Sequence, residues 1–178
     1  MIDTMSLTSG IKEALERNVK ALTLRPAVGQ GTKITRVRLG AQMRCEIEEG
    51  PWKLTAGMPS AFGGDNEMPT PGVFGRAALG ACLAIGYAMW AARLDIPIQS
   101  LEVEVHSDFD ARGELAVGDD IRPGHMAIRY FVRVVSDASD DLILQCLDAA
   151  DVHSSWRDNF TNPIPMIREV EITRSSTV

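Results

Sequence analysis

The chain has 178 residues, of which 45% are hydrophobic and 24% are charged, and its formal net charge is −6. This length favours a single domain and is enough to bury a sizeable core. The negative charge argues against a surface that binds nucleic acid or anionic lipid. We therefore expect neither a nucleic-acid partner nor a membrane partner.

The three cysteines, Cys45, Cys82 and Cys146, have neither the C-x-x-C spacing of a zinc site nor the even number of a disulfide framework. The first residues show no basic segment followed by an apolar run, which argues against a signal peptide. We expect a cytoplasmic protein with reduced thiols and no metal or cofactor.

The first third of the chain changes from helical to strand periodicity. Apolar positions recur at helical spacing over residues 11–22 and predict an amphipathic helix with Ser9 as its N-cap. From residue 33 the period becomes two, so residues 33–57 predict a short antiparallel meander. We interpret residues 1–28 as an N-terminal helical appendage and residues 29–178 as the main domain.

A Gly- and Pro-rich loop then leads into a run of sixteen uncharged residues between Arg76 and Arg93. Thr70 and Pro71 suit a helix start, so we expect a helix over about residues 71–94. The run is shorter than the roughly 20 apolar residues of a membrane span. It lacks a polar face, so we expect a core helix covered by a sheet, by another helix and by another subunit.

The second half of the chain begins with alternation over residues 98–110, which predicts a strand with one solvated face. Residues 125–136 predict a second strand, and apolar residues on both of its faces favour a central position. Helical spacing returns over residues 142–153, and residues 164–172 predict a closing strand. Strands joined to strands by short connections indicate an α+β domain with antiparallel pairing.

Cys82 lies on the long helix in a column of small residues with Ala78 and Gly86, which favours close approach of another backbone. One interpretation is a small apolar residue in a tight seam. A nucleophilic thiol needs a stabilised thiolate, and the start of its own helix is about three turns away, beyond the range of the helix dipole. The candidate arginines are Arg36, Arg38 and Arg44 on the early strands and Arg168 on the last one.

The segment "GGDNEMPTPGVFGRAALGACLAIGYAMWAARLDIPIQSLEVEV" resembles the core of the OsmC/Ohr family, and "DAADVHSSWRDNFTNPIPMIREVEI" resembles its second helix and closing strand. The resemblance covers roughly residues 33–173. It implies an OsmC-like α+β fold in which antiparallel sheets pack on two long helices of an intertwined homodimer, with sites at the interface. It also implies a peroxiredoxin-like thiol peroxidase that reduces organic hydroperoxides in the oxidative stress response.

In that family a first cysteine attacks the peroxide, a second cysteine forms a disulfide with it, and an arginine oriented by a glutamate stabilises the thiolate. By this resemblance Cys82 matches the attacking cysteine. Ser154 stands at the position of the second cysteine, and Cys146 lies about 12 Å earlier along a helix. Gly72 stands at the position of the glutamate. Two acids of the preceding loop are candidate replacements for it, Asp65 and Glu67.

The missing second cysteine leaves three interpretations open. The first is a one-cysteine thiol peroxidase, an oxidoreductase that reduces small organic hydroperoxides through Cys82 with an external thiol reductant. The second is a non-catalytic dimeric protein that binds an apolar small molecule in an interfacial pocket. The third is a family member in which the cysteine is structural.

Overall fold

The structure is a computed structural model, and it describes residues 10–174. The helices and strands follow in the order α1 (Ile11–Leu24), β1 (Arg36–Leu39), β2 (Cys45–Glu49), β3 (Trp52–Ala56), α2 (Pro71–Arg93), β4 (Ser100–Asp108), α3 (Ala111–Glu114), β5 (Ala127–Val135), α4 (Asp140–Val152) and α5 (Ser155–Thr161). Three 3₁₀ turns lie at Pro26–Gly29, Ala41–Met43 and Ser60–Phe62. The strands form two antiparallel sheets, β1–β2–β3 and β4–β5, which confirms the α+β class.

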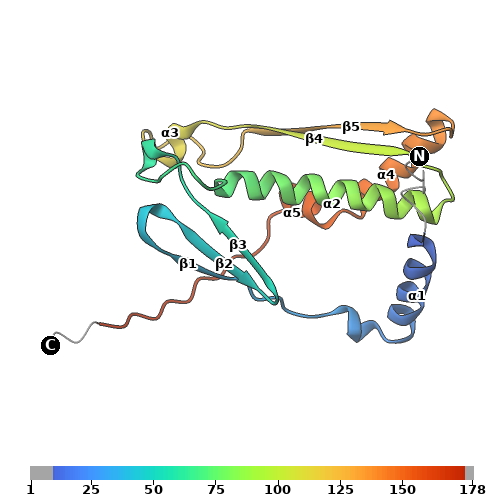
Figure 1. Cartoon of the computed structure of the whole chain (residues 1–178), viewed down its shortest axis with the longest axis horizontal. Helices are drawn as coiled ribbons and strands as arrows, with labels where there is room; N and C mark the ends of the chain where they lie inside the picture. Colours follow the sequence, from blue (N-terminus) through green and yellow to red (C-terminus); the bar gives the residue numbers. More distant parts are fainter. Residues whose placement is uncertain (1–9, 175–178) are drawn as a thin grey trace.

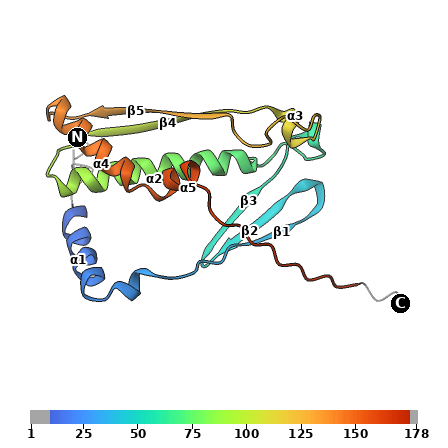
Figure 2. The same cartoon turned by 180° about the vertical axis from the view of Figure 1, so that it is seen from behind.

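Helix α2 runs along the middle of the molecule, and the β4–β5 sheet lies along one side of it (Figure 1). Helices α4 and α5 lie along another side, as the view from behind shows (Figure 2). Gly80 permits the close contact with β4, because a Cβ atom at this position would lie 3.3 Å from Val105 Cγ2. The long uncharged helix is therefore covered by a sheet and by other helices, as its composition predicts.

The core lies between α2, the β4–β5 sheet and α4. Helix α2 buries Leu79, Leu83, Tyr87 and Ala91, which are spaced four residues apart and so lie on one side of the helix. Cys146 of α4 is buried beside this side, with its Sγ 3.8 Å from the carbonyl oxygen of Tyr87. Full burial of a large apolar side chain contributes roughly 1.5–3 kcal/mol to stability. Because turning α2 about its axis would expose this buried row, the burial fixes the side that α2 presents to the core.

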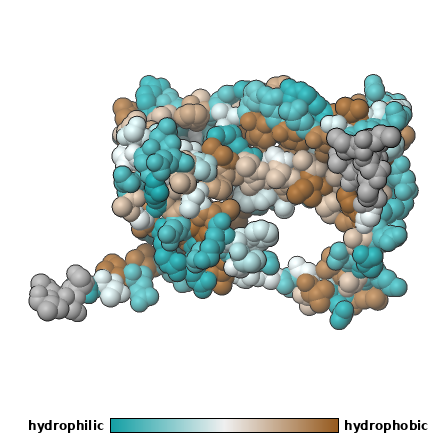
Figure 3. Space-filling model, viewed as in Figure 1, coloured by the Kyte–Doolittle hydropathy of each residue, from teal (hydrophilic) through white to brown (hydrophobic). Residues whose placement is uncertain are grey.

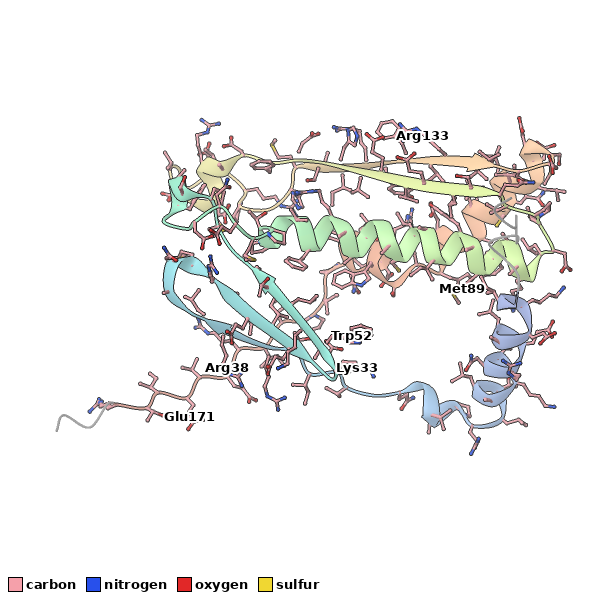
Figure 4. The ribbon with its side chains drawn as sticks, in the orientation of Figure 1. Lys33, Arg38, Trp52, Met89, Arg133 and Glu171 are labelled. Atoms are coloured by element: carbon pink, nitrogen blue, oxygen red, sulfur yellow. The ribbon has the colours of Figure 1, made fainter. Side chains whose placement is uncertain are left out.

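The opposite side of α2 is exposed in the part of the chain that the structure describes. It carries a second row at the same spacing, which we call the exposed stripe: Val73, Ala77, Ala81, Ile85 and Met89. Ile85 is 60% exposed, and Met89 points away from the β4–β5 sheet, toward the hollow beneath α2 (Figure 4). Apolar surface borders this hollow in the space-filling view (Figure 3). The described part of the chain does not supply the third cover, another subunit, that the composition predicts.

Helix α2 has the length of a membrane span, and an 18-residue window within it reaches a mean hydropathy of 1.4. Its packing against β4 and α4 is that of a core helix, because Leu79, Leu83 and Tyr87 are buried within the protein. These contacts account for its apolar composition on two of its sides.

Strand β5 does not take the central position that its apolar content predicts, because within residues 10–174 it pairs only with β4, in a two-stranded sheet. Its burial alternates along the whole strand, so only one face meets the core. The outer face carries Arg129 and Arg133, which pair with Asp108 and Glu104 of β4. Apolar residues on that face, such as Phe131, remain 47% exposed.

The closing strand expected over residues 164–172 is wrong for the single chain. These residues form no strand, and the segment runs out past the β1–β3 sheet (Figure 1). Met166 is 94% exposed and Ile167 is 89% exposed. A strand needs a neighbouring strand to bond its backbone groups, and residues 10–174 offer none to the segment. Arg168 therefore lies on an unpaired segment.

Helix α1 packs against α2 and is joined to its end by an ion pair between Lys12 and Asp95. It begins at Ile11 with Gly10 in the capping position, and the predicted cap Ser9 lies outside the described residues. At the other end of the chain, the helix predicted through residue 153 is interrupted: α4 ends at Val152 and α5 begins at Ser155. This interruption forms the site described next.

Candidate active site

Cys82 lies on α2 at the border between the buried side and the exposed stripe, and it is half-buried. Its Sγ atom is 3.4 Å from Ser154 Oγ and 3.7 Å from Ser155 Oγ. Ser154 is the N-cap of α5, and its Oγ accepts a hydrogen bond from the amide of Arg157 at 3.4 Å. The chain turn between α4 and α5 thus brings the start of a helix against the thiol.

The surroundings of Cys82 act on its pKa in opposite directions. Burial raises the pKa of the thiol, whereas hydrogen bonds from the Ser154 hydroxyl, from the Trp156 amide and from the hydroxyl and amide of Ser155 lower it. The net result is a pKa below the ordinary value for cysteine. The physical cause is the set of N–H and O–H donors at the start of α5, which stabilise a thiolate.

The three arginines of the early strands lie elsewhere in this chain. Arg38 bonds to Glu48 across the β1–β2 ladder at 3.2 Å, and Arg36 lies opposite the same glutamate in the register. Arg44 precedes β2 and pairs with acids of the loop before α2. Over residues 10–174, no hydrogen bond joins an arginine to Cys82. Among the described residues, the groups that hydrogen-bond to the sulfur belong to the N-cap and first turn of α5.

Arg44 has the carboxylate partners that the sequence offers as replacements for a glutamate at Gly72. Its guanidinium bonds to Asp65 through Nε and to Glu67 through Nη2. The pKa of Asp65 is lowered by a hydrogen bond from the Glu67 amide and by the Arg44 guanidinium. These bonds hold Arg44 in a fixed direction at the turn between β1 and β2.

A cavity of about 650 Å³ opens beside Cys82, between α2 and the turn from α4 to α5. Its apolar wall includes Ile85, Met89 and Trp90. Trp90 stacks on His153 with ring centroids 5.2 Å apart, and the guanidinium of Arg93 lies 5.0 Å from the Trp90 centroid. The cavity could therefore admit an apolar molecule and bring one of its atoms to the thiol.

The other two cysteines lie in different environments. Cys146 is 1% exposed, and burial raises the pKa of its thiol. Cys45 is half-buried on β2, opposite Ala56 of β3. Cys82, by contrast, has a lowered pKa and lies beside a cavity lined by apolar side chains.

The histidines show no metal-binding arrangement within residues 10–174, where no group of three or more His, Cys, Asp or Glu side chains converges. His106 bonds to Glu104 on the outer face of β4 at 2.5 Å. His153 stacks on Trp90 beside the cavity. These contacts give both rings local partners in the protein.

The start of α5 is the part of the site that periodicity did not reveal. A signal for it is present, because Ser154 and Ser155 are residue types that cap helices, and Asp158 is an acid in the first turn of α5. The continuous helical spacing up to His153 conceals the interruption. Only the fold shows that this helix start faces Cys82.

The comparison with known families matches residues 64–168, more than half of the chain, to the family described as OsmC-like protein. The chain belongs to the OsmC-like protein family. The matched range contains α2 and α5, and therefore both Cys82 and Ser154. The resemblance read from the sequence is confirmed. No curated protein matches this OsmC-like chain in sequence.

Solved structures share the fold of this OsmC-like chain at low identity. An OsmC like protein from Mycoplasma pneumoniae is 14% identical with a TM-score of 0.65, over 74% of this chain and 89% of that one. A Legionella pneumophila organic hydroperoxide resistance protein OsmC is 15% identical with a TM-score of 0.55, over 72% and 88%. An organic hydroperoxide resistance protein from Elizabethkingia anophelis is 11% identical with a TM-score of 0.55, over 72% and 87%.

Proposed function

We propose that this OsmC-like protein is a one-cysteine thiol peroxidase that reduces organic hydroperoxides through Cys82 in the cytoplasm. The observation that carries the proposal is the position of the Cys82 sulfur, 3.4 Å from the N-cap hydroxyl of α5 and at the edge of a cavity with an apolar wall. The donors around the sulfur favour its thiolate, which is the nucleophilic form. Structural neighbours described as organic hydroperoxide resistance proteins point to the same chemistry.

The proposed reaction begins when the Cys82 thiolate attacks the terminal oxygen of a hydroperoxide ROOH. The O–O bond breaks, the alkoxide leaves and takes up a proton as ROH, and the sulfur loses two electrons to become a sulfenic acid. An external thiol then condenses with the sulfenic acid, which releases water and forms a mixed disulfide. A second external thiol reduces this disulfide, restores Cys82 and leaves as the oxidised disulfide.

The proposed reaction needs an external reductant because the side chain next to the Cys82 thiol is a serine. Ser154 occupies the place from which a second thiol could reach Cys82, and a serine oxygen forms no disulfide. Cys146 is enclosed in the core between α4 and α2, so its thiol is held away from solvent. Cys82 is half-buried and borders an open cavity, which leaves its sulfenic acid accessible to a small thiol.

We infer that the working form is a homodimer. The five residues of the exposed stripe carry no charge, and residues 164–172 alternate as a strand does but have no ladder partner among the described residues. A second copy would cover the stripe and pair with the segment, which removes apolar surface from water and satisfies backbone groups. In such a dimer, the turn that carries Arg44 is a candidate to approach the Cys82 site of the other chain.

The test measures consumption of cumene hydroperoxide with dithiothreitol as reductant, for the wild type and for Cys82→Ser. We expect turnover by the wild type and none above background for the variant. Cys45→Ser is the matched control and should keep wild-type turnover, because Cys45 lies on β2 outside the site. Equal rates for the wild type and Cys82→Ser would exclude catalysis by this thiol.

The second candidate function is binding of an apolar small molecule without catalysis. The wall of Ile85, Met89 and Trp90 favours it, because this part of the cavity presents few groups that bond to water. Native mass spectrometry of the protein as purified tests this candidate. A bound apolar compound, together with absent peroxidase turnover, would replace the first proposal with the second.

A further inference from the structure

Two tyrosine side chains from different elements bond to one carboxylate of a third element, behind the Cys82 site. The Tyr87 hydroxyl of α2 donates a hydrogen bond to Asp151 Oδ1 at 2.6 Å. The Tyr130 hydroxyl of β5 donates one to Asp151 Oδ2 at 2.5 Å. Asp151 belongs to the last turn of α4, so α2, β5 and α4 are joined at this residue. We call these three residues the aspartate anchor.

The aspartate anchor lies inside the protein. Tyr87 is 1% exposed, Tyr130 is on the inner face of β5, and the Asp151 side chain is 22% exposed. Burial and the nearby Asp151 carboxylate raise the pKa of both tyrosines, so both phenols stay protonated donors at neutral pH. Hydrogen bonds to a charged group are stronger than those between neutral groups, and they weaken less where water is excluded.

The anchor connects directly to the turn that carries the two serines. The amide of Ser154 donates a hydrogen bond to the backbone carbonyl of Asp151 at 3.3 Å, so the two residues share one turn. On the far side, Arg157 of α5 donates from Nε to the Tyr130 hydroxyl at 3.3 Å, and its amide bonds to Ser154 Oγ. Both sides of the N-cap are therefore held by the anchor.

We infer that the aspartate anchor is a positioning device that holds the start of α5 against Cys82 and thereby sets the acidity of this thiol. The inference rests on the proposed function in so far as it requires a titrating Cys82. None of the three anchor residues contacts the sulfur, so each acts through Ser154 and the amides that follow it. A displacement of the serines by about 1 Å would take both contacts beyond hydrogen-bonding range.

Helix α5 is too short to hold its own direction, which is why bonds from the rest of the protein are needed. The helix has seven residues, and isolated helices this short are unstable in water. Its start would not keep a fixed direction without bonds to the rest of the protein. The anchor supplies such a bond through Tyr87 of α2, the helix that also carries Cys82. The sulfur and the donors at the start of α5 are therefore both held by α2.

The experiment compares Tyr87→Phe, Tyr130→Phe and Asp151→Asn with the wild type in the rate of Cys82 alkylation by iodoacetamide as a function of pH. Peptide mass spectrometry follows Cys82 separately from the other thiols. The other groups that face or border the sulfur are the hydroxyls of Ser154 and Ser155 and the cavity side chains of His153 and Arg93, and all are left unchanged. Asp148→Asn is the matched control, because Asp148 is an exposed acid of the same helix.

We expect each anchor variant to raise the pH midpoint of Cys82 alkylation and to slow alkylation at pH 7 by about threefold or more, which corresponds to half a pKa unit. The control should keep the wild-type midpoint. Thermal unfolding verifies that the variants are folded, and Tyr130→Phe, which alters the less buried phenol, serves if Tyr87→Phe does not fold. Unchanged midpoints in folded variants would overturn the inference. Raised midpoints in a protein without peroxidase turnover would refute the proposed function and leave the positioning role standing.

Discussion

The Ser154 hydroxyl lies 3.4 Å from the Cys82 sulfur, although 72 positions separate the two residues in the chain. Cys82 comes from the middle of α2, and Ser154 comes from the interruption between α4 and α5. The contact replaces the pair of thiols that a two-cysteine peroxidase would have with one thiol and one hydroxyl. The serine therefore supports the thiolate, and in the proposed reaction the resolving step falls to an external thiol.

Removing the Ser154 hydroxyl should make Cys82 less acidic. Because the pKa of Cys82 is lowered in the folded protein, its thiolate fraction rises through a pH range below the free-thiol value of about 8.5. Ser154→Ala removes one donor, so we expect the midpoint of the alkylation profile to move to higher pH. The rate at pH 7 should fall about three- to tenfold, since a hydrogen bond to a charged group is worth roughly 1.5–3 kcal/mol and less at a partly exposed site.

The same pKa shift makes folding stability depend on pH. A thiol whose folded pKa is depressed contributes stability above the unfolded pKa, and this contribution is lost as the pH falls through the folded pKa. The difference in unfolding free energy between the wild type and Ser154→Ala should therefore be larger at pH 9 than at pH 6. Urea titrations at the two pH values measure it, and an equal difference at both would contradict the assigned cause of the shift.

The variant Ser154→Cys should convert the protein into a two-cysteine form. The replaced oxygen is already 3.4 Å from the Cys82 sulfur, so a small movement would bring two sulfurs to the bonding distance of about 2.05 Å. We expect treatment with hydroperoxide to produce an intramolecular disulfide, detected as the loss of two free thiols and a mass decrease of about 2 Da. Ser100→Cys, on the first residue of β4, should form no such bond.

Cys82 and Cys146 should react with an alkylating agent in a fixed order. Cys82 reacts first because its pKa is lowered and it borders a cavity. Cys146 should react only on unfolding, because it is 1% exposed and burial raises its pKa. Quantitative peptide mapping at pH 7 gives the order, and fast labelling of Cys146 in the folded protein would show that the core around α4 opens readily.

A charge on the exposed stripe should prevent the proposed dimer without unfolding the chain. Ile85 is 60% exposed in the single chain, so Ile85→Glu leaves the core contacts of α2 unchanged. We expect light scattering after size exclusion to give the mass of a dimer for the wild type and of a monomer for this variant. Leu144→Glu, at an exposed position of α4, is the control and should remain dimeric. A monomeric wild type at micromolar concentration would oppose the inferred assembly.

Several parts of the fold follow from local patterns. Helix α2 was expected over residues 71–94 and spans Pro71–Arg93, because proline marks its start and its apolar run has no interruption. The strand over residues 98–110 appears as β4, since alternation directly reports one buried face. Residues 164–172 show the limit of this method. These residues alternate as a strand does, but a strand also requires a neighbouring strand. The pattern within one segment does not identify that neighbour.

The amino-acid sequence by itself determined the family, the α+β class, the long core helix and the presence of a serine where a second cysteine would be expected. These features depend on residue types at fixed spacings, which can be read along a single segment. Only the tertiary structure decided which groups surround Cys82. The donors at its sulfur belong to the start of α5, and their direction depends on Tyr87, Tyr130 and Asp151, three residues from three elements. Contacts between distant segments are set by packing, and periodicity along the chain carries no record of them.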